Sequence, residues 1–119
     1  MNFSPPETLK KRAFFLRAAA RGQKIASAGM VVQILPTAPG EPLRVGYTTT
    51  KKLGNAVARN RARRRLREAA RLTLAGLNLT QVDLVLIGRH DTAKLPFPQL
   101  CAALRQTVQA RVHSQGSLL

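Results

Sequence analysis

The sequence predicts an α+β fold in which helices pack on a mixed β-sheet. Apolar residues recur at helical spacing in three segments, and three short runs of β-branched or apolar residues lie between turns. Along the chain these segments come in the order helix, strand, strand, helix, strand, helix. A helix that joins the second and third strands implies a β-α-β unit, whose crossover the usual rule would make right-handed.

The chain opens with a predicted arm and a predicted helix. Residues 1–7 carry two adjacent prolines and are expected to form a flexible arm. A helix is predicted for residues 8–20, and Gly22 is expected to stop it. Its apolar residues at helical spacing are Leu9, Ala13, Leu16 and Ala20, with Phe15 and Ala19 beside them.

Two strands and a long helix follow. Residues 30–35 (MVVQIL) and 44–50 (RVGYTTT) are predicted to be antiparallel strands joined by a loop rich in proline and glycine. The next helix is predicted for residues 55–74 and ends before Gly76. Asn55 is expected to be its N-cap, because an Asn side chain accepts hydrogen bonds from first-turn amides.

The last strand and helix complete one domain. Residues 82–88 (VDLVLIG) are mostly apolar, which favours a central strand. Pro96 and Pro98 are expected to precede a final helix. Its core stripe would be Phe97, Leu100, Leu104, Val108 and Val112. With 119 residues the chain is expected to be a single domain (residues 1–119), with a core over residues 8–113 and a frayed tail over residues 114–119.

The charge balance indicates a polyanionic partner. The chain has 20 Lys and Arg against 5 Asp and Glu, a formal net charge of +15. Such an excess repels itself in a compact state, and binding to a polyanion would relieve the repulsion. Nucleic acid is the leading candidate and an anionic membrane surface the second.

Several other functions are disfavoured. No apolar run is long enough to span a membrane, and the first residues lack the apolar centre of a secretory signal. The single cysteine, Cys101, suits a reducing cytoplasm and is expected to be a small core residue. His90 and His113 lie far apart, and the five acids form no cluster in sequence. We therefore predict no catalytic residue and no metal site in the protein itself.

The densest basic segment lies at the start of the 55–74 helix. Residues 51–67 hold eight Lys and Arg and no acid. At 100° per residue, one helix face gathers Ala62, Leu66, Ala69, Ala70, Thr73 and Leu77 for the core. The opposite face gathers Asn60, Arg61, Arg64, Arg67 and Arg71. Arg59 falls near the sheet-facing side, toward Lys52, so we expect two basic surfaces rich in the guanidinium groups that suit phosphate.

Residues 44–68, RVGYTTTKKLGNAVARNRARRRLRE, resemble the signature of the bacterial ribonuclease P protein subunit. The upstream segment KKRAFFLRAAARG resembles the first helix of that family, and the likeness in element order covers about residues 15–113. The resemblance implies a two-layer α/β sandwich with a mixed sheet of about four strands. It also implies a left-handed β-α-β crossover, against the usual rule.

The family resemblance implies an RNA-processing role. In the family a catalytic RNA cleaves the 5′ leader from precursor tRNA with RNA-bound Mg²⁺, so the protein itself would bind no metal. The expected partners are ribonuclease P RNA and precursor tRNA, not DNA or a membrane, and the expected location is the cytoplasm.

Individual residues are implied by position. From the helix face and the resemblance taken together, the residues expected to bind the catalytic RNA are Arg59, Asn60, Arg61, Arg64, Arg67 and Arg71. Those expected to line a cleft for the leader are Phe15, Met30, Val32, Lys51, Lys52, Ala56 and Arg59. Ala19 and Gln33 stand where family members often carry aromatic residues, so leader binding is expected to rest more on charge.

Two other functions share the basic composition. A structural ribosomal protein or RNA chaperone would also use a basic helix, but would not require a Lys-Lys-x-Gly-Asn turn beside a groove. A nucleoid-like DNA binder would usually need a dimer with two groove-reading elements, and the sequence contains no dimer seam.

Overall fold

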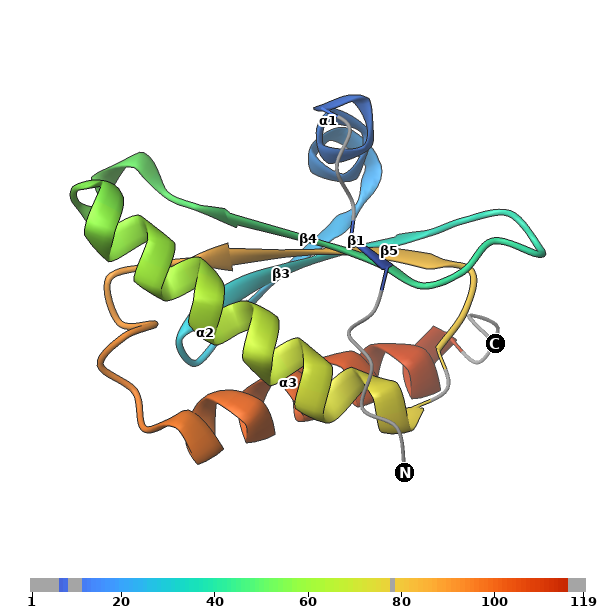
Figure 1. Cartoon of the computed structure of the whole chain (residues 1–119). Coiled ribbons are helices and arrows are strands. Elements are labelled where there is room, and N and C mark those ends of the chain that lie inside the picture. Colours follow the sequence, from blue (N-terminus) through green and yellow to red (C-terminus); the bar gives the residue numbers. More distant parts are fainter. Residues whose placement is uncertain (1–6, 9–11, 78, 116–119) are drawn as a thin grey trace.

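The structure is a computed structural model that describes residues 7–8, 12–77 and 79–115. Within these residues, ten elements follow each other (Figure 1). In order they are β1 (Glu7–Thr8), α1 (Arg12–Arg21), β2 (Gln23–Ser27), β3 (Met30–Pro36), β4 (Arg44–Thr49), η1 (Lys51–Leu53), α2 (Ala56–Leu74), η2 (Ala75–Leu77), β5 (Val82–Gly88) and α3 (Phe97–Gln115).

One mixed sheet organises the molecule, with the strand order β1-β4-β5-β3-β2. β5 is central as predicted, and it pairs parallel to β4 and antiparallel to β3. Helices α2 and α3 lie together on one face, and α1 crosses the other face (Figure 1). The predicted α+β class with a mixed sheet is confirmed.

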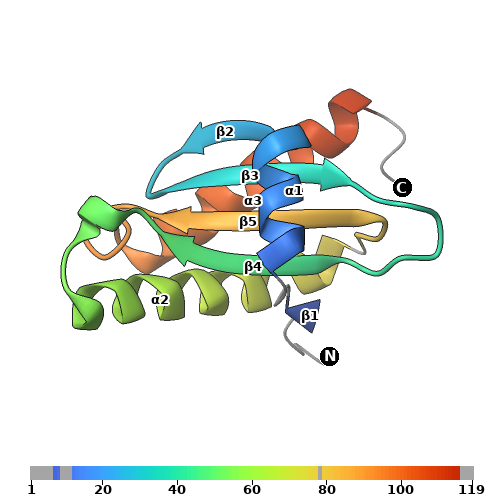
Figure 2. The same ribbon diagram turned by 90° about the horizontal axis from the view of Figure 1, so that it is seen from above.

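The β4-α2-β5 crossover is left-handed. In Figure 2, β4 and β5 both point to the left, β5 lies above β4 in the view, and α2 runs behind the sheet. Seen from the helix side with the strands pointing up, β5 therefore lies to the left of β4. The usual right-handed rule fails here, as the family resemblance implied.

The main core fills the space between the sheet and the pair α2 and α3. Alternate strand residues point into it, among them Met30, Val32, Val45 and Leu86. Helix α2 contributes Leu66 and neighbouring alanines, and α3 contributes the predicted stripe of Leu100, Leu104 and Val108. The side chain of Val112, also predicted for this stripe, lies outside the described side chains.

Helix α1 differs from the prediction in its start and in its buried face. It begins at Arg12, and Thr8, which was predicted to lie in this helix, belongs to the short strand β1. Leu16 is 55% exposed, while Phe14, Phe15 and Ala18 face the sheet in a second small cluster with Val85. Two phenylalanines bury more apolar area than the Leu16 stripe offers, so they decide which face turns inward.

Two strands were not predicted. Gln23–Ser27 forms edge strand β2, which joins β3 through a turn where Gly29 has φ of +79°. Ile25 is its one large apolar residue, so the sequence of this segment has no alternating apolar pattern, which explains the miss. Glu7 was assigned to a flexible arm but pairs with Arg44 at the sheet edge. The rest of that predicted arm, residues 1–6, lies outside the described residues.

The remaining corrections concern pairing and the end of the chain. The two strands predicted to be antiparallel neighbours, now β3 and β4, are separated by β5. A strand as apolar as β5 requires cover on both faces, which α1 supplies on one side of the sheet and α2 with α3 on the other. Helix α3 extends to Gln115, two residues into the predicted tail, and residues 116–119 lie outside the described part.

Candidate nucleic-acid interface

The start of α2 is built by a glycine and an asparagine. Gly54 has φ of +141°, a conformation that side chains with a Cβ rarely adopt. Asn55 is the N-cap as predicted, and its Oδ1 accepts a hydrogen bond from the Ala58 amide at 3.0 Å. Arg59 is half-buried and donates from Nε to the Gly54 carbonyl at 3.0 Å. The turn therefore fixes both the helix direction and its first arginine.

The outer face of α2 presents the predicted basic row. We define this row as Asn60, Arg61, Arg64 and Arg67, whose residues are all exposed. The opposite face is buried against the core through Ala62, Leu66, Ala69, Ala70 and Thr73. The predicted orientation of the helix is therefore confirmed, and the row is open to a large partner.

Three members of this helix surface already have local partners. Asn60 Oδ1 accepts a hydrogen bond from Arg63, and the Arg67 guanidinium lies 5.3 Å from the centre of the Tyr47 ring. Arg71 is half-buried and forms an ion pair with Glu68. The Arg71 hydrogen bond holds the pKa of Glu68 below its usual range, so this carboxylate stays charged and partly neutralises the end of the row.

Arg65 belongs to the fold and not to this surface. Its Nε donates to the Thr92 carbonyl at 3.1 Å and its Nη2 donates to the Leu95 carbonyl. The guanidinium also lies 5.6 Å from the centre of the Phe97 ring. Arg65 therefore ties α2 to the segment between β5 and α3, a role that the run of adjacent arginines did not reveal.

A hollow of about 370 Å³ lies beside α1 at the β4 side of the sheet. It is lined by Arg12, Phe15, Tyr47 and Thr48, so of the predicted cleft residues it contains Phe15. Lys51, Lys52 and Ala56 are exposed where the chain continues from β4 through η1 into α2. Arg12, Tyr47 and Thr48 were not predicted, because their contribution depends on how α1 crosses the sheet.

Met30 and Val32 do not belong to this cleft. Both are fully buried in the main core, on the sheet face that α2 and α3 cover. Strand residues alternate between faces, so a shift of one residue changes the face. Their neighbours Val31 and Gln33 pair with Ile87 and Val85 on the face that α1 crosses. The sequence contained the alternation, but not which half of it faced α1.

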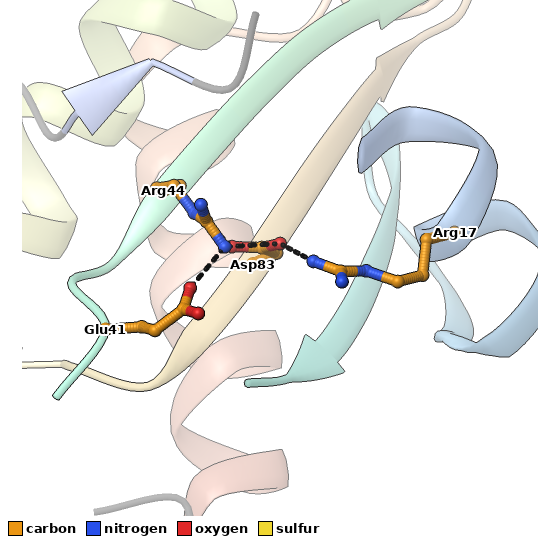
Figure 3. A network of polar contacts seen from close by, with 4 residues as sticks. All are labelled: Arg17, Glu41, Arg44 and Asp83. Carbon is orange, nitrogen blue, oxygen red and sulfur yellow. Dashed lines mark hydrogen bonds and ion pairs between the residues drawn. The ribbon is translucent and has the colours of Figure 1, made fainter. Parts of the chain in front are cut away.

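An ion-pair network centred on the buried Asp83 links α1 and β4 to β5 (Figure 3). Asp83 on β5 is fully buried and accepts from Arg44 Nε at 2.9 Å, while Arg17 Nη2 lies 3.6 Å from its other oxygen. Arg44 also donates to Glu41 at 2.6 Å. The Phe14 ring lies 4.4 Å from the Arg44 guanidinium. This network holds α1 across the sheet and thereby fixes the position of Phe15.

The described residues show no group of three or more His, Cys, Asp or Glu side chains that could hold a metal ion. Each of the four acids with a described side chain has an arginine partner. His90 is exposed, whereas the His113 side chain lies outside the description. Among the described helices, none combines the length and apolar character that crossing a membrane requires.

The chain is similar to known proteins over most of its length. Residues 3–111 match the family model described as Ribonuclease P. The ribonuclease P protein component of Gluconacetobacter diazotrophicus is 52% identical over 101 residues, covering 85% of this chain and 87% of the relative. That of Ruegeria pomeroyi is 50% identical over 104 residues, covering 85% and 82%. A solved structure of the Staphylococcus aureus RNase P protein superposes with a TM-score of 0.71 at 27% identity, covering 87% of this chain and 94% of that one.

Proposed function

The chain belongs to the ribonuclease P protein family, and on that premise we propose how it serves its ribonucleoprotein. The outer row of α2 binds the catalytic RNA, and the cleft beside α1 holds the 5′ leader of precursor tRNA. The protein is a subunit of an endonuclease and is not itself catalytic. In this proposal Mg²⁺ bound by the RNA supplies the chemistry of 5′ maturation.

The observation that carries the proposal is the exposed row Asn60, Arg61, Arg64 and Arg67. Its three arginines recur every third residue, so they follow one side of the helix with a rise of about 4.5 Å per step. Exposed guanidinium groups bind phosphate oxygens in pairs and release counterions on doing so. Arg59 and Arg71 flank the row, but both are half-buried and Arg71 is paired with Glu68, so in this proposal they contribute less than the exposed row.

The cleft supports a different kind of contact. Phe15 and Tyr47 both line the hollow, but Tyr47 is only 9% exposed, so Phe15 offers the accessible aromatic face. A base stacked on such a face contributes about 1–3 kcal/mol to binding. Lys51, Lys52 and Ala56 lie beyond the end of β4, where they would follow the backbone of a single strand. Ala19 is exposed and cannot add a second stacking face, so charge supplies more of the leader affinity.

The proposed partners are ribonuclease P RNA and precursor tRNA, and the proposed location is the cytoplasm, without DNA or a membrane as a partner.

Reconstitution tests the role. Added to bacterial ribonuclease P RNA, the chain should lower the Mg²⁺ concentration needed to remove the 5′ leader. The chain with Mg²⁺ but without the RNA should release no mature 5′ end. An unchanged Mg²⁺ requirement would contradict the proposal.

Two double variants separate the two surfaces. Phe15→Ala with Lys52→Ala should weaken binding of leader-bearing precursor tRNA by the reconstituted complex and leave mature tRNA binding unchanged. Arg64→Ala with Arg67→Ala should weaken assembly with the catalytic RNA, and through it the binding of both tRNA forms. Arg105→Ala, an exposed arginine on α3, is the charge-matched control. Equal losses for both tRNA forms in both variants would contradict the division.

A further inference from the structure

A second hollow, of about 240 Å³, lies between α1 and the end of β3. Arg17 and Arg21 line it from α1, one helical turn apart, and Thr37 and Glu41 line it from the chain after β3. None of these residues belongs to the α2 row or lines the hollow at Phe15. The hollow is therefore a separate site from the two surfaces of the proposed function.

The charges around this hollow leave a net positive group. Arg44 lies between Glu41 and Asp83 and bonds to both carboxylates. Arg17 reaches Asp83 with one nitrogen at 3.6 Å and remains 42% exposed. Arg21 is exposed and makes no hydrogen bond or ion pair with the residues that the structure describes. Three guanidinium groups thus meet two carboxylates, and Arg21 carries the uncompensated charge.

One residue that lines the hollow, Thr37, carries a hydroxyl group without a partner among the described residues. Thr37 Oγ1 is enclosed and forms no hydrogen bond within the described residues, although the Thr37 amide donates to the Gln81 carbonyl at 2.8 Å. Enclosing a hydroxyl without a partner is unfavourable. Rotation about the Thr37 side-chain bond would turn this donor into the hollow, where an anion between Arg17 and Arg21 would accept from it.

We propose that this hollow binds one phosphodiester group of an RNA. Two guanidinium groups and a hydroxyl donor match the oxygens of a phosphate. The other lining residues include Leu35, Pro36 and Ala38, which offer neither a stacking face nor a base-reading group. The site therefore recognises the RNA backbone and not its sequence, and it would add a contact on the opposite side of α1 from Phe15.

The first experiment uses inorganic phosphate as the probe and does not depend on the ribonuclease P role. In a nuclear magnetic resonance titration at constant ionic strength, phosphate should shift the Arg21 Nε and Thr37 amide signals to saturation, and chloride should not. Arg21→Gln should weaken this binding several-fold, and Arg21→Lys should restore part of it. Arg105→Gln removes the same charge from α3, on the other sheet face, and should bind phosphate as the unaltered chain does.

Thr37→Val separates binding from folding. Valine replaces the enclosed hydroxyl with a methyl group of similar size, so the melting temperature should stay equal or rise, while phosphate affinity falls. Equal phosphate affinity in the unaltered chain, Arg21→Gln and Thr37→Val would overturn the site.

The second experiment identifies the source of the phosphodiester. The salt dependence of binding should flatten by about 0.7 to 0.9 in Arg21→Gln, the change expected for one lost phosphate contact. A flatter slope with the catalytic RNA alone assigns the phosphate to that RNA. A flatter slope only when precursor tRNA binds the assembled complex assigns it to the tRNA. An unchanged slope in both arms would overturn the proposal even if inorganic phosphate binds.

Discussion

The outer face of α2 and the network beneath α1 use the same side chain in opposite ways. Arg61, Arg64 and Arg67 lie exposed on the helix surface. Arg44 instead bonds to a fully buried carboxylate and is itself 14% exposed. A guanidinium group with an internal acceptor stabilises the fold. One without an internal acceptor has an uncompensated charge that is available to a partner. The difference between the two regions lies in the acceptors and not in the arginines.

Arginines that stabilise the fold and arginines that are open to a partner can be adjacent in the sequence. Arg64 is exposed, yet Arg65 next to it points to another side of the helix and donates to two backbone carbonyls. Arg89 likewise donates from Nη2 to the Ser27 carbonyl at 2.7 Å. A basic run in a sequence is therefore not one functional unit, because successive helix positions are rotated by about 100°.

The largest effect should follow from breaking the network. Arg44→Met leaves the buried Asp83 carboxylate with Arg17 alone at 3.6 Å, so the free energy of unfolding should fall by about 3–5 kcal/mol. Urea unfolding followed by circular dichroism measures this loss. Arg105→Met, at an exposed position on α3, is the matched control and should change stability by less than about 0.5 kcal/mol.

A second variant shows whether the loss comes from the stranded charge. Arg44→Met combined with Asp83→Leu removes both partners, so it should be clearly more stable than Arg44→Met alone. If the double variant loses the sum of the two single changes, the network contributes no specific pairing and the comparison with α2 fails.

The outer row should show the reverse behaviour. Replacing Arg61, Arg64 and Arg67 together by Ala should flatten the salt slope of RNA binding by about 2 to 3, from 0.7 to 0.9 per lost contact. Stability should change by no more than about 1 kcal/mol, because Arg67 alone has a ring contact. An unchanged salt slope in filter-binding measurements would exclude the row as the RNA contact.

The neighbours Arg64 and Arg65 give the sharpest pairwise test. Arg65→Gln should lower the free energy of unfolding by about 1.5–3 kcal/mol, since it removes charged hydrogen bonds to Thr92 and Leu95. At a temperature where both variants are folded, its RNA affinity should exceed that of Arg64→Gln. Arg64→Gln should keep its stability and lose affinity. Matching behaviour of the two variants in both assays would show that the run acts as one unit.

Much of the fold could be predicted because local chemistry is explicit in the sequence. Asn55 as N-cap, the buried alanines of α2 and the central position of the apolar strand at residues 82–88 follow from residue type and spacing. The left-handed crossover could not be derived from the residues. Local patterns specify elements, and the hand of a connection depends on how those elements pack.

The orientation of the candidate side chains was predicted well where they lie on one helix and poorly where they lie between elements. The exposed row of α2 is a property of a single helix, and its orientation was predicted correctly. The cleft depends on which strand face α1 covers, so Met30 and Val32 were placed wrongly and Arg12 and Thr48 were missed. No periodicity within one strand tells which of its two faces a distant helix will cross.

The last effect is confined to high pH and should appear at Tyr47, where the core and the outer row meet. Burial raises the pKa of Tyr47 to about 12, and the nearby Arg67 charge lowers it in part. Below pH 10 the phenol is neutral in both the folded and the unfolded chain, so the raised pKa costs no stability. Between pH 10 and about 12 the unfolded chain ionises first, and stability should fall by about 2–3 kcal/mol in all.

Tyr47 is the single tyrosine of a chain without tryptophan, so phenolate absorbance reports on this residue alone. Its titration midpoint should lie near 12 while circular dichroism shows a folded chain. Arg67→Ala should move the midpoint further upward, because the positive charge beside the ring favours phenolate. The Tyr47→Phe variant serves as the blank for the absorbance measurement. A midpoint near 10 in the folded chain, or a downward shift in Arg67→Ala, would mean that the row and the core are not coupled at this contact.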